Sequence, residues 1–171
     1  MDRVPFDGDD ELPKKIWLHI AGMFVCGFVL QFSYEVSGGT AWSILVSSIN
    51  SSPWEWTKPF VLVYMMWSFI EMSCCRPHLL HYVCARILSL HTLTALCLGS
   101  LCLLKCWTAN DYVILGVILC CLAAAEFLMW LWYRSKCRFE LFFVPIILSL
   151  VLLFGCLLFC SLYPLPLFCF R

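Results

Sequence analysis

The chain has 171 residues, of which 63% are hydrophobic and only 13% are charged. A typical soluble domain has about 45–50% apolar and about 25% charged residues, so the composition argues against an ordinary water-soluble enzyme and favours lipid as the solvent. The 11 basic and 11 acidic side chains give zero net charge. Without a basic face we expect no nucleic-acid partner. The mean hydropathy of +0.89 leaves no polar stretch long enough for a second domain.

A polar tail, residues 1–15, opens the chain and carries acidic residues before Lys14 and Lys15. This order is unlike that of a secretory signal, so we expect a cytoplasmic N-terminal tail. Each apolar segment that follows is near the ~20 residues that a helix needs to cross about 30 Å of hydrocarbon. The segments are 16–34, 59–75, 83–105, 112–133 and 139–162.

The predicted fold is therefore all-α, a single membrane domain over residues 16–162 with about five transmembrane helices. A longer first loop spans 35–58, and a short C-terminal tail spans 163–171. The other connections are short, so consecutive helices should be antiparallel neighbours. The 13 cysteines fall mostly in apolar runs and lack zinc-like CxxC spacing. We expect free thiols and no metal site.

The basic residues predict how the chain is oriented in the membrane. Eight would lie on one side and three on the other, which places the N-terminus in the cytoplasm and the C-terminus outside or in a lumen. The first group is Arg3, Lys14, Lys15, Arg76, Arg86, Arg134, Lys136 and Arg138; the second is Lys58, Lys105 and Arg171. The lipid bilayer is the expected partner, with other membrane subunits or a second copy as alternatives.

The start of the second long helix can be predicted to the residue. Ser52-Pro53-Trp54-Glu55 has the spacing of a capping box. Ser52 would accept the amide of Glu55, and Pro53 suits the first helical position. Pro59 and Pro145 should each disturb the hydrogen bonding of their helix, because proline has no amide hydrogen to donate.

The same region resembles an uncharacterised family of bacterial multi-pass membrane proteins. The family hallmark is Asn-Glu-Ser-x-Trp-Glu-His-x-Lys after a first helix that ends in Tyr-Glu, with a further Glu late in the second helix. The matching residues are Asn50, Ser52, Trp54, Glu55 and Lys58, flanked by Tyr34, Glu35 and Glu71. The resemblance covers roughly residues 22–71 and implies a multi-pass fold without an assigned activity.

The chain departs from that family at three positions. Ser51 replaces a Glu, Trp56 replaces a His, and Gln31 stands where a His is common. Chemistry that needs those ionisable groups is therefore not implied for this chain.

Ionisable residues within the apolar segments are candidates for function, because such groups cost several kcal/mol in a bilayer unless they are paired or hydrated. At ~1.5 Å per residue, the inner candidates lie within roughly 12 Å of the cytoplasmic interface. They are His19, Glu71, Arg86, His91 and Glu126. This layer could relay protons, hold a cationic ligand or bind a divalent metal. Alternatively, Glu126 pairs with His91 or Arg86 to fix the bundle, while Glu71 and His19 reach the headgroups.

A second set of candidates lies on the outer side, in and after the first loop. It consists of Glu35, Asn50, Trp54, Glu55 and Lys58. A polar pocket rimmed by tryptophans could bind a headgroup or small ligand. In the structural alternative, Glu55 completes the helix cap and Lys58 pairs with Glu35 to hold the loop.

The sequence contains no nucleophile elbow, phosphate-binding loop, dinucleotide fingerprint or zinc-protease motif. We expect small-solute or lipid-headgroup binding or transport through polar residues inside the bundle. The alternatives are a structural or accessory subunit of a larger membrane complex and an intramembrane lipid-modifying enzyme. No cofactor can be assigned.

Overall fold

The computed structural model describes residues 12–47, 52–75, 79–105, 110–135 and 143–162. Regular structure in these residues is entirely helical, which confirms the all-α prediction. The helices are α1 (Leu12–Gln31), α2 (Ser33–Val36), α3 (Ala41–Val46), α4 (Pro53–Cys75), α5 (Leu79–Lys105), α6 (Asp111–Arg134) and α7 (Phe143–Leu162).

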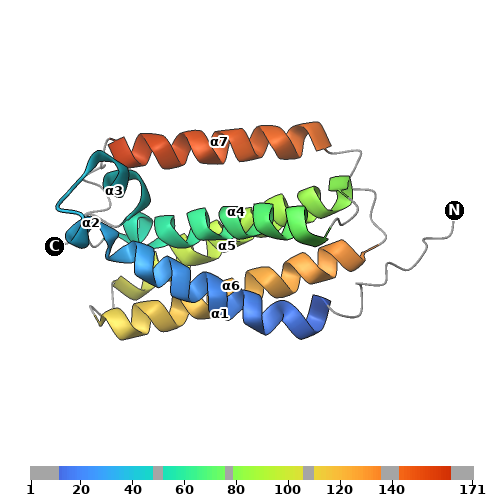
Figure 1. Ribbon diagram of the computed structural model, residues 1–171, viewed down its shortest axis with the longest axis horizontal. Coiled ribbons are helices and arrows are strands. Elements are labelled where there is room, and N and C mark those ends of the chain that lie inside the picture. The colour runs from blue at the N-terminus through green and yellow to red at the C-terminus, as the bar shows by residue number, and fades with distance from the viewer. Residues whose placement is uncertain (1–11, 48–51, 76–78, 106–109, 136–142, 163–171) are drawn as a thin grey trace, which may run out of the picture.

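The five long helices lie side by side, and each runs opposite to the one before it (Figure 1). The short helices α2 and α3 cover the end of the bundle where α1 ends and α4 begins. Helix α1 therefore begins at one end of the bundle, and α7 ends at the other.

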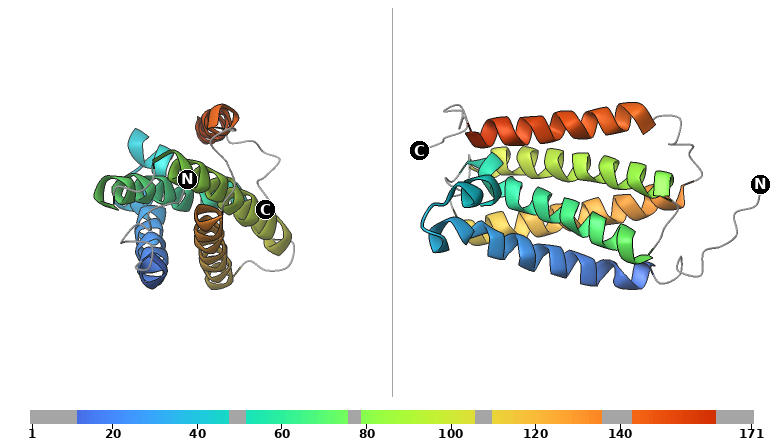
Figure 2. Two further views of the ribbon diagram at one scale, coloured as in Figure 1. Left: turned by 90° about the vertical axis from the view of Figure 1, so that its right-hand side faces the viewer. Right: turned by 45° about the horizontal axis from the view of Figure 1, so that its top comes forward.

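Four of the long helices form a closed ring. Helix α1 contacts α4 and α6, and α5 contacts the same two helices from the opposite side. Helix α7 lies outside this ring and packs on α5 and on α3, as the end-on view in Figure 2 shows. Side chains with no exposed surface fill the ring, among them Met23, Phe60, Leu93, Ile118 and Leu122.

Two helical stretches, Leu80–Leu104 and Asp111–Arg134, are long and apolar enough to cross a membrane. Helices α1 and α7 contain shorter apolar stretches, Ile16–Gln31 and Phe143–Cys156. The helical bundle is thus confirmed, whereas crossing by all five long helices stays a prediction.

Helix α4 begins at the predicted residue. The Glu55 amide donates to Ser52 Oγ at 3.3 Å, as in a capping box. The helix continues through Pro59 to Cys75. Pro145 lies in the first turn of α7, where the amide would have no helical partner in any case. The earlier start expected for this helix, at residue 139, lies outside the described residues.

The first loop is partly helical rather than irregular. Gly38 and Gly39 have φ values of 68° and 81°, a conformation that glycine adopts without strain and that allows the turn between α2 and α3. Ser47 Oγ then donates to the Gln31 carbonyl at 2.6 Å, which fastens the end of α3 to the end of α1.

Close packing of α1 on α4 depends on two glycines. A Cβ added to Gly27 would lie 2.4 Å from the buried ring of Phe60, and one added to Gly22 would lie 2.8 Å from Trp67. A Cβ at Gly99 or Gly116 would meet nothing within 4 Å.

We therefore expect Gly27→Ala to separate α1 from α4 and to destabilise the protein by about 1–3 kcal/mol, the usual cost of overpacking. Thermal unfolding in lipid nanodiscs measures this loss. Gly99→Ala is the matched control, because it adds the same methyl group to open space within a helix. Equal stability of the two variants would contradict the packing of α1 on α4.

Candidate functional site

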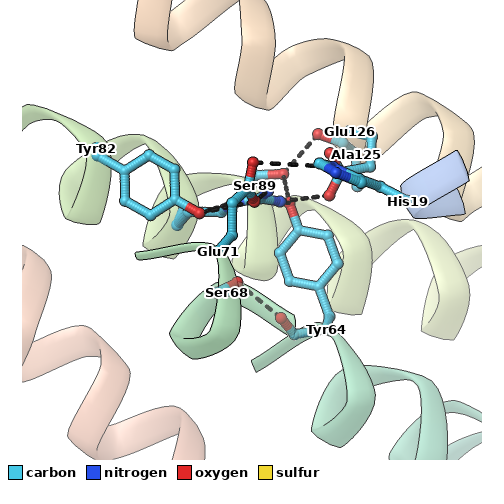
Figure 3. A network of polar contacts seen from close by, with 9 residues as sticks. His19, Tyr64, Ser68, Glu71, Tyr82, Ser89, Ala125 and Glu126 are labelled. Atoms are coloured by element: carbon cyan, nitrogen blue, oxygen red, sulfur yellow. Dashed lines mark hydrogen bonds and ion pairs between the residues drawn. The ribbon is translucent and has the colours of Figure 1, made fainter. Parts of the chain in front are cut away.

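Polar side chains at helical spacing converge in the interior of the bundle. On α4, Tyr64 and Glu71 are seven residues apart and so share one face. On α5, Tyr82, Arg86 and Ser89 lie at i, i+4 and i+7 of one face. Helix α6 adds Glu126 and α1 adds His19. We call these seven residues the Arg86 network; Figure 3 shows their contacts.

Arg86 is the centre of this network and is only 4% exposed. Its guanidinium donates to both carboxylates, with Nη2 on Glu71 and Nη1 on Glu126. It also donates from Nε to the Tyr82 hydroxyl at 2.9 Å and from Nη1 to the Tyr64 hydroxyl at 3.0 Å. Its carbon centre lies 5.3 Å and 5.5 Å from the two tyrosine ring centres. One side chain thus holds α4, α5 and α6 together.

Each hydroxyl group of the network accepts one hydrogen bond and donates another. Tyr82 accepts from Arg86 and donates to Glu71 Oε2 at 2.8 Å. Ser89 Oγ donates to the Ala125 carbonyl at 2.5 Å. The Tyr64 hydroxyl lies 2.6 Å from Ser89 Oγ. Because the Ser89 hydrogen is used on Ala125, Tyr64 donates to Ser89, and it accepts from Arg86. Each of the three hydroxyls therefore has both a donor and an acceptor.

The charges of the network do not balance. Two buried carboxylates share one guanidinium, which leaves one negative charge if His19 is neutral. His19 Nδ1 lies 3.8 Å from Glu71 Oε1, and the His19 ring packs edge-on against Trp67 at 5.5 Å. The His19 side chain is 13% exposed. A proton on His19 would neutralise the network.

Four of the five inner residues predicted to share a layer do meet, namely His19, Glu71, Arg86 and Glu126. The pairing of Glu126 with Arg86, one of the two alternatives, is present. The alternative in which Glu71 reaches the headgroups is wrong, because Glu71 is 6% exposed and is bound by Arg86 and Tyr82.

His91 does not join the network. Its ring faces α7, with Nδ1 2.7 Å from the Ile87 carbonyl and Nε2 3.3 Å from the Ser149 carbonyl.

The sequence interpretation also missed Tyr64, Tyr82 and Ser89, which are uncharged. Their spacing from Glu71 and Arg86 was a usable signal, because residues four and seven apart on a helix share a face.

Among the outer candidates that the structure describes, Glu55 and Lys58 lie together, whereas Glu35 does not join them. Lys58 Nζ lies 2.9 Å from Glu55 Oε2, and both side chains are at most 3% exposed. Lys58 therefore pairs with Glu55 three residues away, and the expected pairing with Glu35 is wrong, because Glu35 is exposed on α2. Trp54 is half-buried, and Asn50 lies outside the described residues.

An apolar cavity of about 220 Å³, partly open at the surface, lies between α4, α5 and α7 beside the network's tyrosines. Its lining is almost entirely carbon. The residues are Tyr64, Met65, Ser68, Phe69, Met72, Tyr82, Val83, Arg86, Ile87, Leu90, Ile147 and Leu150. The polar atoms of Tyr64, Tyr82 and Arg86 are bonded within the network, so the cavity meets chiefly their carbon surfaces. Such a surface suits a hydrocarbon occupant.

Within the described residues, no three His, Cys, Asp or Glu side chains are grouped so that they could hold a metal ion. The contacts that the Arg86 network does make are charge pairs and hydrogen bonds.

We expect Arg86→Met to destabilise the protein by about 3–5 kcal/mol, because it leaves two buried carboxylates without a counter-charge. Glu126→Gln should cost far less, since it removes the excess charge and keeps an oxygen that accepts from Arg86. Arg134→Met is the matched control, at an exposed arginine that contacts Trp130 near the end of α6. Denaturation of the variants in nanodiscs gives the order of their free energies of unfolding. Equal losses for Arg86→Met and Arg134→Met would contradict the central role of Arg86.

No protein-family model matches the chain, and neither curated proteins nor solved structures are significantly similar to it. The resemblance over residues 22–71 stays a prediction. What the chain does must therefore be inferred from the Arg86 network and the cavity beside it.

Proposed function

We propose that this chain is a multi-pass membrane protein that binds a lipid acyl chain in the cavity between α4, α5 and α7. The observation that carries this proposal is the cavity of about 220 Å³, lined by carbon, beside a polar network that is already bonded to itself. Ligand pockets for drug-sized molecules usually measure roughly 300–1,000 Å³, so one narrow apolar chain fits this volume better.

The distribution of side chains supports a lipid environment. Large apolar residues on the outer surface include Trp17, Leu103 and Val144, which are 72–76% exposed. Ionisable side chains are buried as well, among them Lys58, Glu71, Arg86 and Glu126, beside the apolar core residues. Large apolar side chains on the outer surface are costly in water and favourable in hydrocarbon. The alternating directions of the five long helices fit five crossings, and the basic residues favour a cytoplasmic N-terminus.

A hydrocarbon ligand has more support than a polar one. The guanidinium of Arg86 donates to two carboxylates and two hydroxyls, so it has little capacity left for a solute or headgroup. Catalysis by Glu71 or Glu126 has less support for the same reason. We expect the headgroup of the bound lipid to stay at the membrane interface.

Leu150 and Val151 allow a sharp test, because they are adjacent on α7 but their side chains face different surroundings. Leu150 lines the cavity, whereas Val151 is 61% exposed on the outer surface. The probe is phosphatidylcholine with a diazirine in its acyl chain, incorporated in nanodiscs. Mass spectrometry should locate photolabel on cavity residues such as Met65, Met72 and Leu90.

Leu150→Trp should fill the cavity and remove most of this labelling, while Val151→Trp should leave it unchanged. Labelling that is confined to outward-facing residues, or that falls equally in both variants, would contradict lipid binding in the cavity.

The proposed topology has its own test. A membrane-impermeant reagent is applied to proteoliposomes of known orientation that carry a unique tag at residue 5 or at residue 168. Five crossings place the two tags on opposite sides, so the reagent should reach only one of them. Labelling of both tags from the same side would indicate an even number of crossings.

A second candidate function is that of an accessory subunit, favoured by the surface of α7. This helix packs on one side only and exposes Val144, Leu148, Val151, Leu152 and Phe159. Another membrane protein could pack there in place of lipid. Co-purification of one partner at fixed stoichiometry would support this function, and a lone stable monomer in native nanodiscs would oppose it.

A further inference from the structure

His91 joins α5 to α7 beside the cavity. Its Nδ1 lies 2.7 Å from the Ile87 carbonyl oxygen on its own helix, and its Nε2 lies 3.3 Å from the Ser149 carbonyl oxygen on α7. Ile87 lines the cavity, and so do Ile147 and Leu150, which lie two residues before and one residue after Ser149 on α7. A change at His91 therefore acts on one wall of the cavity.

The two contacts of His91 place a restriction on its charge. A carbonyl oxygen can only accept a hydrogen bond, so both ring nitrogens would have to donate. A neutral imidazole carries one N–H and can donate to only one of the two oxygens. The other nitrogen then directs its lone pair at a carbonyl oxygen. Only the protonated ring, which has two N–H groups, satisfies both contacts.

The charged groups on the helices that pack against α5 are not paired with His91 within the described residues. Helix α7 contains no acidic, lysine, arginine or histidine residue. On α4 and α6, which pack against α5, Glu71 and Glu126 are bound by Arg86, and Glu55 is bound by Lys58. Asp111 and Arg134 lie at the two ends of α6. Within the described residues His91 forms no ion pair, so its contacts depend on its own protonation.

We propose that His91 is a protonation-dependent clasp that holds α7 against α5 and so fixes the α7 wall of the cavity. In the protonated state both carbonyls are bonded. In the neutral state the ring keeps the shorter bond to Ile87 and loses the one to Ser149, so α7 loosens. The bound chain then exchanges with the bilayer. The effect on the ligand rests on the lipid-binding function proposed above, whereas the clasp itself does not.

The clasp is tested without any ligand measurement. Spin labels carried by non-natural amino acids at Leu96 on α5 and Leu152 on α7, both exposed, report the distance between the helices. Lowering the pH favours the protonated form of a histidine ring, and raising it favours the neutral form. The distance distribution should be narrow at pH 5 and should broaden towards longer distances at pH 8. Ring nitrogen NMR should show two protonated nitrogens on His91 in the narrow state.

Three variants separate the clasp from other titrating groups. His91→Phe should give the broad distribution at both pH values. His91→Gln, whose amide can donate to Ser149 without a charge, should remain narrow at both. His81→Phe is the control on the same helix, since the His81 ring contacts the Tyr133 carbonyl of α6 instead, and it should keep the wild-type pH dependence. The clasp would be overturned if the distance distribution of the wild type did not change with pH, or if its pH dependence remained in His91→Phe.

Photolabelling with the diazirine phosphatidylcholine separates this proposal from the proposed function. If both hold, cavity labelling should fall by roughly tenfold from pH 5 to pH 8, the scale of one hydrogen bond to a charged group. A pH-dependent distance with no cavity labelling at either pH would support the clasp and reject lipid binding. Cavity labelling with a pH-independent distance would support lipid binding and reject the clasp.

Discussion

The structure depends on one interaction, the binding of two carboxylates and two phenol hydroxyls by the buried guanidinium of Arg86. Arginine suits this position because it remains charged and presents donors in a fixed plane, so it can bind groups from several directions at once. Here those groups come from α4, α5 and α6, and His19 extends the contact to α1. Each helix of the ring must therefore keep one rotation about its axis. Apolar packing, which lacks direction, does not impose this.

Satisfying the polar groups internally has consequences for the rest of the molecule. The outer surface is left to large apolar side chains, which suits lipid, and the cavity beside the network is left with a carbon lining. Helix α7 lies outside the ring and shares no charge with it. The polar contact from His91 to the Ser149 carbonyl therefore gains importance for holding α7 on α5.

Much of this fold follows from the sequence, because long apolar runs and a capping box set where helices lie. The rise of ~1.5 Å per residue also placed His19, Glu71, Arg86 and Glu126 at one depth. The depth of a residue in the membrane does not say which side of the helix it faces. His91 was therefore grouped with the inner layer from the sequence, although it faces another helix. It follows Arg86 by five residues, which is about 140° around the helix, so it faces α7. Tyr82 and Ser89 lie on nearly the same face of α5 as Arg86, and their spacing was a usable signal, but attention to ionisable residues alone left these uncharged side chains out. Lys58 was matched to Glu35 across the loop, although Glu55 lies one turn away on the same helix.

The contact between Arg86 and the two carboxylates in a bilayer can be measured directly. Proteoliposomes containing protein with 15N-labelled arginine side chains and 13C-labelled glutamate carboxyl groups would be studied by dipolar-recoupling solid-state NMR. A strong coupling between guanidinium nitrogens and carboxyl carbons is expected, reduced by Glu71→Gln or Glu126→Gln alone and absent in Arg86→Met. A spectrum without such coupling, or one that Arg86→Met leaves unchanged, would contradict the account.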